Sequence, residues 1–190
     1  MQENLTLEEQ KILLRLAREA MERGVRGEEL PPLDLTSLPM VLREEGSSFV
    51  TLTSGGLLRG CIGALDAYQP LAEDARVHAI AAACKDPRFP PVQEEELSLI
   101  QIEISRLTRP VALEYKDAED LISKLRPEVD GVILHDHSQH RATFLPQVWT
   151  KIPDPAQFLN NLCYKMGLEP DSWCHIHFEV LTYQAEEFHE

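Results

Sequence analysis

The chain lacks the features that mark membrane proteins, secreted proteins and small domains held together by metal. Its four cysteines stand far apart, and no two of them form a Cys-x-x-Cys pair. This spacing argues against a zinc ribbon and a dithiol redox motif, and we expect reduced thiols in a cytoplasmic protein. No apolar run approaches the roughly 20 residues that span a bilayer, and the N-terminus lacks the basic start and apolar run of a signal peptide.

Positive charge is also scarce. The chain has 18 lysines and arginines against 32 aspartates and glutamates, which gives a formal net charge of -14 at pH 7. Such a charge repels an anionic membrane or a phosphate backbone, so we expect no membrane association and disfavour nucleic acid as a partner. A local basic cleft is the remaining alternative, and it would give salt-dependent binding.

What is present is an ordinary globular composition. Hydrophobic residues make up 43% of the chain and charged residues 26%, which is far from disordered or fibrous sequences. A chain of 190 residues can bury most of its apolar surface without a disulfide or metal. We expect one domain over residues 1–190, built from two lobes.

Local signals place the elements of the first half. Thr6 and Glu9 form a capping box that starts a helix, and Gly24 ends it. The next segment, 25–46, is rich in proline and glycine and predicts a connection with at most one helical turn. The elements expected after it are a hairpin of strands 49–53 and 57–64 joined at Ser54-Gly55-Gly56, and a helix over 70–84.

Along the whole chain, a hairpin, a helix and a strand appear roughly twice in that order. The elements expected in the second half are a strand through Ile100, Ile102 and Ile104, a helix from the Asp117 cap to Leu125, a hairpin of 132–134 and 143–145, a helix from Asp154 to Gly167, and a strand through Ile176, Phe178 and Val180. Hairpins indicate antiparallel pairing rather than a doubly wound parallel sheet. The predicted class is α+β, with antiparallel hairpins packed against helices in two interleaved lobes around a cleft.

Arg59 and Cys61 carry the main candidate site. Alternation along a strand predicts that both side chains share one face, about 6 to 7 Å apart, where the guanidinium would favour a thiolate. Gly60 and Gly63 leave the backbone open to a ligand. The alternative is that Cys61 is a small buried hydrophobe and the glycines mark a bulge.

A second candidate segment is 86–91, Asp-Pro-Arg-Phe-Pro-Pro. Asp86 can shape a turn, and Arg88 offers a planar fork of donors for a carboxylate or phosphate, with Phe89 beside it. We expect Arg88 to reach the pocket or to hold the loop at its rim. The alternative is that Asp86 and Arg88 only lock the loop.

The histidines predict no metal site. His135, His137 and His140 lie at a hairpin tip, where a solvated turn explains them better than metal ligation. His175 and His177 alternate on the last predicted strand and fit its exposed face. His78 follows the Cys61 hairpin on a helix, and a surface histidine is favoured there over a catalytic base. We expect no cofactor.

Three ordered segments resemble the signature of a known family: 58–63, 86–91 and 143–148, the last reading Thr-Phe-Leu-Pro-Gln-Val. The family is that of the AMME-syndrome chromosomal region (AMMECR), called AmmeMemoRadiSam system protein A in bacteria and archaea. The resemblance runs from the first helix to 183–188. It implies a two-lobed α+β fold with the Arg-Gly-Cys strand near a cleft, and a role beside a Memo-type protein and a radical SAM protein.

Two function classes remain open, and a nucleic-acid modification factor ranks below both. The first is a ligand-binding or accessory module. The second is a thiol-dependent enzyme in which Cys61 attacks a small anionic substrate or nucleotide, Arg59 and Arg88 bind its anionic group, and Glu103 or His78 moves a proton. Its weakness is the missing base. For a binding role we expect Arg59→Ala to weaken binding more than Cys61→Ser does.

Overall fold

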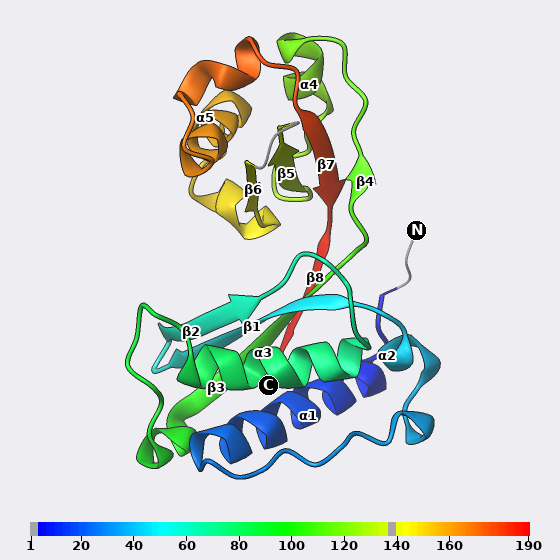
Figure 1. Ribbon diagram of the computed structural model, residues 1–190, viewed down its shortest axis with the longest axis vertical. Coiled ribbons are helices and arrows are strands. Elements are labelled where there is room, and N and C mark those ends of the chain that lie inside the picture. The colour runs from blue at the N-terminus through cyan, green and yellow to red at the C-terminus, as the bar shows by residue number, and fades with distance from the viewer. Residues whose placement is uncertain (1–3, 137–139) are drawn as a thin grey trace. The chain divides into compact units, whose positions relative to one another are not determined.

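The computed structural model describes residues 4–136 and 140–190, which form two compact units. Of these residues, unit 1 comprises those up to Thr108 together with Glu186–Glu190, and unit 2 comprises those between Arg109 and Ala185 (Figure 1). Each unit combines helices with one four-stranded antiparallel sheet. The predicted α+β class is confirmed.

Unit 1 is a sheet of order β2-β1-β3-β8 with the long helices α1 and α3 beside it (Figure 1). Its elements are α1 (Leu7–Val25), η1 (Leu35–Ser37), α2 (Met40–Arg43), β1 (Ser47–Ser54), β2 (Leu57–Gly63), α3 (Leu71–Cys84), η2 (Glu94–Leu99), β3 (Ile100–Leu107) and β8 (Ala185–His189).

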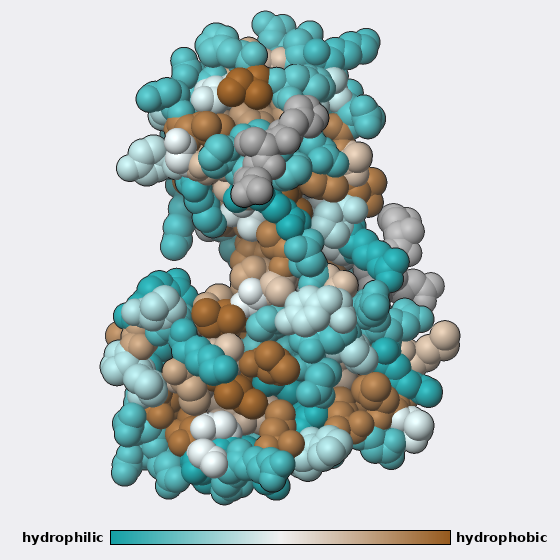
Figure 2. Space-filling view, viewed as in Figure 1, coloured by the Kyte–Doolittle hydropathy of each residue, from teal (hydrophilic) through white to brown (hydrophobic). Residues whose placement is uncertain are grey.

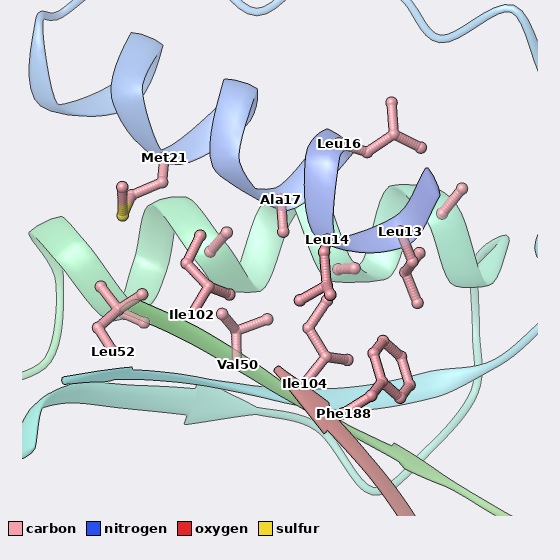
Figure 3. Packing of buried hydrophobic residues seen from close by; sticks show 14 of the residues in the cluster. Leu13, Leu14, Leu16, Ala17, Met21, Val50, Leu52, Ile102, Ile104 and Phe188 are labelled. Atoms are coloured by element: carbon pink, nitrogen blue, oxygen red, sulfur yellow. The ribbon is translucent and has the colours of Figure 1, made fainter. Parts of the chain in front are cut away.

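Helix α1 begins and packs as its sequence predicts. Thr6 accepts a hydrogen bond from the Glu9 amide and the Glu9 carboxylate accepts one from the Thr6 amide, so the capping box is confirmed. Leu13 and Met21 on the apolar face of α1 point toward Val50 and its neighbours on the sheet (Figure 3). This core positions the strands that carry the candidate site.

The sheet of unit 1 therefore has two distinct faces. Val50, Leu52 and Ile104 are fully buried in the core on the inner face, toward the helices. Alternate residues such as Thr51, which is half-buried, point to the opposite, outer face. On the inner face of β2, Gly60 lies so close to α3 that a Cβ added there would be 2.1 Å from the Ala82 carbonyl oxygen.

The segment 25–46, predicted as a connection, lies wholly within unit 1. It carries two short helices, η1 and α2, instead of the single turn expected. Asp34 caps η1 by accepting a hydrogen bond from the Thr36 amide, a local signal that the density of prolines obscured.

Unit 2 has its own sheet, of order β4-β7-β5-β6, and its own core. Trp149 and Phe158 stack at its centre with ring centroids 3.7 Å apart. The predicted caps Asp117 and Asp154 are confirmed, because each accepts the amide three residues on. Its elements are β4 (Val111–Ala112), α4 (Ala118–Lys124), β5 (Gly131–His135), β6 (Arg141–Phe144), η3 (Pro146–Thr150), α5 (Pro155–Lys165), η4 (Pro170–Cys174) and β7 (Glu179–Tyr183).

Tyr183 joins three strands of the unit 2 sheet. Its ring covers Gly131, where an added Cβ would be 2.4 Å from the ring. Its hydroxyl donates to the Phe144 carbonyl at 3.2 Å and lies 2.9 Å from the Thr143 hydroxyl. Burial raises the pKa of Tyr183 to about 12. These contacts hold the start of the third family-like segment, 143–148.

The end of the chain differs from the prediction. The last strand of unit 2 begins at Glu179, so His175 and His177 precede it rather than alternating along it. His175 ends η4, and His177 stacks on Tyr115 with ring centroids 4.4 Å apart. The strand β8 was not predicted, and it pairs with β3 in the sheet of unit 1.

Within the described residues, no helix combines the length and apolarity needed to cross a membrane. On the face shown in Figure 2, hydrophilic residues cover much of both units and brown, apolar groups are interspersed among them.

Candidate functional site

Cys61 lies on the outer face of the unit 1 sheet. It pairs with Thr51 of β1, and the neighbouring pair of Val50 and Ile62 belongs to the core on the inner face. The Cys61 side chain is half-buried, and the Thr51 hydroxyl donates to its sulfur at 3.4 Å. The thiol therefore accepts a weak hydrogen bond on the outer face of the sheet and is not enclosed in the core of the inner face.

The backbone of Cys61 is bonded by two side chains from the 86–91 segment. Because β2 is an edge strand, the outer N–H and carbonyl of Cys61 have no strand to pair with. Asp86 Oδ2 accepts from the Cys61 amide at 2.8 Å, and Arg88 Nη2 donates to the Cys61 carbonyl at 3.1 Å. The Asp86–Arg88 pair thus replaces the hydrogen bonds of a neighbouring strand.

Asp86 and Arg88 also bind each other in a bidentate ion pair. Arg88 Nε donates to Asp86 Oδ1 at 2.9 Å and Arg88 Nη2 donates to Asp86 Oδ2 at 2.6 Å. Hydrogen bonds from the Arg88 side chain hold the pKa of Asp86 well below its usual range. Asp86 raises the pKa of Arg88, and the Cys61 side chain adds to this. The guanidinium beside the Cys61 thiol is therefore that of Arg88.

Arg59 is engaged elsewhere. Leu58 pairs with Thr53 and Gly60 with Leu52, so Arg59 is the extra residue of a β-bulge and has no facing partner in the register.

Each of the three nitrogens of the Arg59 guanidinium donates a hydrogen bond within unit 1. Its Nε and Nη2 donate to Glu96 at 2.7 and 2.9 Å, and its Nη1 donates to the Pro90 carbonyl at 2.8 Å. The Arg59 side chain is 15% exposed, whereas that of Arg88 is 54% exposed. Arg88 Nη1 makes no hydrogen bond to any described residue, so Arg88 is the more exposed of the two arginines and the one that has an unbonded nitrogen for a ligand.

Glu103 shares the outer face with Cys61. It pairs with Thr51 from the other side, so the order across the strands is Cys61, Thr51, Glu103. Two strand spacings separate Cys61 from Glu103, which is about 10 Å and beyond the reach of direct proton transfer. Glu103 is half-buried and raises the pKa of Glu187 through like-charge repulsion, after the larger effect of burial.

The two glycines of the strand have packing roles. Gly60 lets α3 approach β2, as the Ala82 contact shows, and Gly63 lies under the ring of Phe49, 2.4 Å from where a Cβ would be. We expected these glycines to give a ligand access to the backbone. In the structure, the space that a side chain would take at both positions is filled by other atoms of unit 1. Phe89 is half-buried, and its ring lies 5.6 Å from the Arg88 guanidinium carbon.

His78 is buried instead of lying on the surface as favoured. Its Nδ1 lies 3.1 Å from Asp74 Oδ2, which also accepts from the Ser48 hydroxyl at 2.7 Å. Ser48 alternates with Val50 on the inner face of β1, so this network and the Cys61 thiol occupy opposite faces of the sheet. His78 is not placed as a base for Cys61.

The tip histidines make separate local contacts. His135 Nδ1 lies 3.2 Å from Glu179 Oε2, and His140 Nδ1 lies 2.7 Å from Asp136 Oδ2. His137 lies outside the described residues. Over the ranges 4–136 and 140–190, no three His, Cys, Asp or Glu side chains are grouped as metal ligands.

Thr51 and Glu96 are site residues that the sequence analysis did not single out. Both reach the site through contacts between residues far apart in the sequence. Thr51 pairs with Cys61 in the sheet, and Glu96 forms an ion pair with the Arg59 guanidinium. The local signals in the sequence are the acidic run at 94–96 and the arginine at position 59. Neither signal predicts that Arg59 and Glu96 form an ion pair.

The model of the AMMECR1 family matches residues 14–188 of the chain. A protein of Methanothermobacter thermautotrophicus is 42% identical over 187 residues, covering 98% of this chain and 96% of that protein. Protein MK0488 of Methanopyrus kandleri is 38% identical over 202 residues, covering 100% and 92%. The crystal structure of the uncharacterized protein PH0010 from Pyrococcus horikoshii matches with a TM-score of 0.87 and 36% identity, covering 98% of this chain and 93% of that one. The chain belongs to the AMMECR1 family.

Proposed function

We propose that this protein is a binding module whose ligand is a small anion held beside Cys61 by Arg88. The observation that carries the proposal is the pair of free donors on the half-exposed Arg88, at Nη1, next to the half-buried thiol of Cys61. A charge-assisted hydrogen bond from a guanidinium is about twice as strong as a neutral one. Carboxylate and phosphate groups fit it best.

Preorganisation supports this role for Arg88. Its Nε and Nη2 are fixed on Asp86 and on the Cys61 carbonyl, so the plane of the guanidinium is set before a ligand arrives. A ligand then orders little of the side chain on binding, and less affinity is lost to conformational entropy.

The surroundings of Cys61 favour binding over catalysis. A cysteine nucleophile needs a base within hydrogen-bond reach. Asp86 is bound to Arg88 and its pKa is held low, Glu103 is two strands away, and His78 is on the other face. Among the described residues, the side chains in contact with the thiol are a hydroxyl and a guanidinium, and neither takes up a proton at neutral pH.

The family resemblance extends this proposal to partners. We propose that the module acts as an accessory to a Memo-type protein and a radical SAM protein in a shared modification pathway. The anion bound beside Cys61 would then be a substrate or product group of that pathway.

One observation favours the alternative of a thiol-dependent enzyme. The Thr51 hydroxyl donates to the sulfur of Cys61 and the Arg88 guanidinium lies close by, so a substrate anion bound to Arg88 would lie next to the sulfur. An enzyme of this kind would attack an anionic substrate through Cys61 and take a proton acceptor from the substrate or from a partner.

The rate of alkylation by iodoacetamide at pH 7 separates the two functions. Cys174 is exposed and serves as an internal reference. For a binding module, peptide mapping should show Cys61 modified no faster than Cys174, because Cys61 is half-buried and lacks a base. Modification of Cys61 at least about tenfold faster than Cys174, and slowed by Arg88→Gln, would instead support the enzyme.

A further inference from the structure

Side chains from all four strands share the outer face of the unit 1 sheet around Cys61. Cys61 pairs with Thr51 and Thr51 pairs with Glu103, so these three side chains form one row across the strands. Glu187 of β8 is on the same face, because its neighbour Phe188 is buried in the core on the inner face. The register therefore places a thiol, a hydroxyl and two carboxylates on one surface.

The two ends of this row carry opposite charges. At the edge of the sheet, the half-exposed guanidinium of Arg88 lies beside Cys61 and has an unbonded Nη1. Two strands further on, the half-buried carboxylate of Glu103 makes no hydrogen bond or ion pair with any described residue. Burial, and then repulsion by Glu103, raise the pKa of Glu187. A positively charged ligand group would therefore stabilise both carboxylates.

The side chains between the two charged ends are small. Cys61 and Thr51 are both half-buried, and the Thr51 hydroxyl donates to the Cys61 sulfur at 3.4 Å. Neither side chain projects far from the sheet, so neither blocks a ligand that lies across β2 and β1. Cys61 and Glu103 are two strand spacings apart, which is about 10 Å, and this span sets the length of a ligand that reaches both ends.

We propose that the ligand of this surface is an elongated molecule with an anionic group at one end, bound by Arg88, and a positively charged nitrogen at the other, bound by Glu103. Linear amino-carboxylates and amino-phosphates have this form. The inference rests on the proposed anion site at Arg88 and extends it to a class of ligand. The charge of the protein agrees with it, because a formal net charge of -14 repels a simple anion but not a ligand with one charge of each sign.

The test compares 10-aminodecanoate, whose extended chain spans two strand spacings of about 10 Å, with decanoate, which lacks the amine. The amide shifts of Cys61, Arg88 and Glu103 in two-dimensional NMR give the Kd of each compound. The amino-carboxylate should bind about tenfold more tightly than decanoate, because it adds a charge-assisted hydrogen bond to Glu103. Glycine holds the same two groups too close together and should bind no more tightly than acetate.

Two variants locate the amine. Glu103→Gln should remove the difference between 10-aminodecanoate and decanoate and leave the Kd of decanoate unchanged. Glu19→Gln is the matched control and should keep the full difference, because Glu19 is an exposed carboxylate on α1, which packs on the inner face. A difference that persists in Glu103→Gln, or that falls equally in both variants, would overturn the inference and leave the anion site at Arg88 intact.

Failure of the anion site itself gives a separate result. If decanoate leaves the amides of Cys61 and Arg88 unshifted, or if its shifts survive Arg88→Gln, the proposed function is wrong and this inference is wrong with it. Circular dichroism of every variant verifies folding.

Discussion

Gly60→Ala is expected to lower the free energy of unfolding of unit 1 by about 3 kcal/mol or more. The added Cβ would lie 2.1 Å from the Ala82 carbonyl oxygen and 3.0 Å from its carbon. Both are backbone atoms of α3, so no side-chain rotation relieves the clash and the helix must move away from the sheet. Urea or thermal unfolding measures the loss, which corresponds to a fall in Tm of roughly 10 °C.

Leu58→Ala is the control for this substitution. It lies on the same strand, two residues away, and its side chain is 44% exposed on the outer face. Its removal should change the free energy of unfolding by less than about 0.5 kcal/mol. A Gly60→Ala protein as stable as the Leu58→Ala protein would contradict the close packing of α3 on β2.

Asp86→Ala should destabilise unit 1 by about 2 kcal/mol. The Asp86 side chain is 2% exposed and accepts from the Cys61 amide, the Arg88 amide and the Arg88 fork. Its loss leaves the edge of β2 without an acceptor. Because the Arg88 side chain is half exposed, water can hydrate its guanidinium after Asp86 is removed, and this limits the loss in the free energy of unfolding.

The pH dependence identifies the carboxylate as the cause. Because the pKa of Asp86 is lowered in the folded state, its stabilising effect is present above the ordinary carboxyl pKa of about 4 and lost as the pH falls through the lower folded value. The difference in stability between wild type and Asp86→Ala should therefore be constant from pH 7 to about pH 5 and shrink below about pH 4.

Asp34→Ala is the matched control, because Asp34 is exposed and caps only Thr36 and its turn. Its effect at pH 7 should be a small fraction of that of Asp86→Ala. Equal effects of the two substitutions would contradict a structural role for the Asp86–Arg88 pair.

Local signals were sufficient to predict much of the fold. The capping box at Thr6 and the caps at Asp117 and Asp154 each bond an amide three residues further along the chain. Such short-range signals can be seen in the sequence, so these helices begin where predicted. The hairpin turn at Gly55 and Gly56 depends on a backbone conformation that glycine adopts readily.

Elements defined by distant partners were not predictable in this way. Strand β8 contains Glu186 and Glu187 and no β-branched residue, so its own sequence does not favour a strand. Its pairing with β3 depends on residues about 80 positions earlier, and contacts such as the Glu186–Arg106 ion pair form only in the folded chain.

The candidate site shows the same limit. Alternation along a regular strand made Arg59 the neighbour of Cys61, but the bulge at Arg59 and the acceptor Glu96 were not visible in the local pattern. The guanidinium that contacts Cys61 comes from Arg88, 27 positions along the chain. The sequence led us to expect that Arg59→Ala weakens ligand binding more than Cys61→Ser does; from the structure we expect this larger effect for substitution of Arg88 instead.

The most direct test of the anion site is a titration with inorganic phosphate, and separately with acetate, followed by amide chemical shifts in two-dimensional NMR. Because Arg88 Nη1 has free donors beside Cys61, the amides of Cys61 and Arg88 should shift saturably in the wild type. Arg88→Gln should abolish these shifts, while Arg59→Gln should retain them. Shifts that survive Arg88→Gln, or that disappear only with Arg59→Gln, would contradict the proposal.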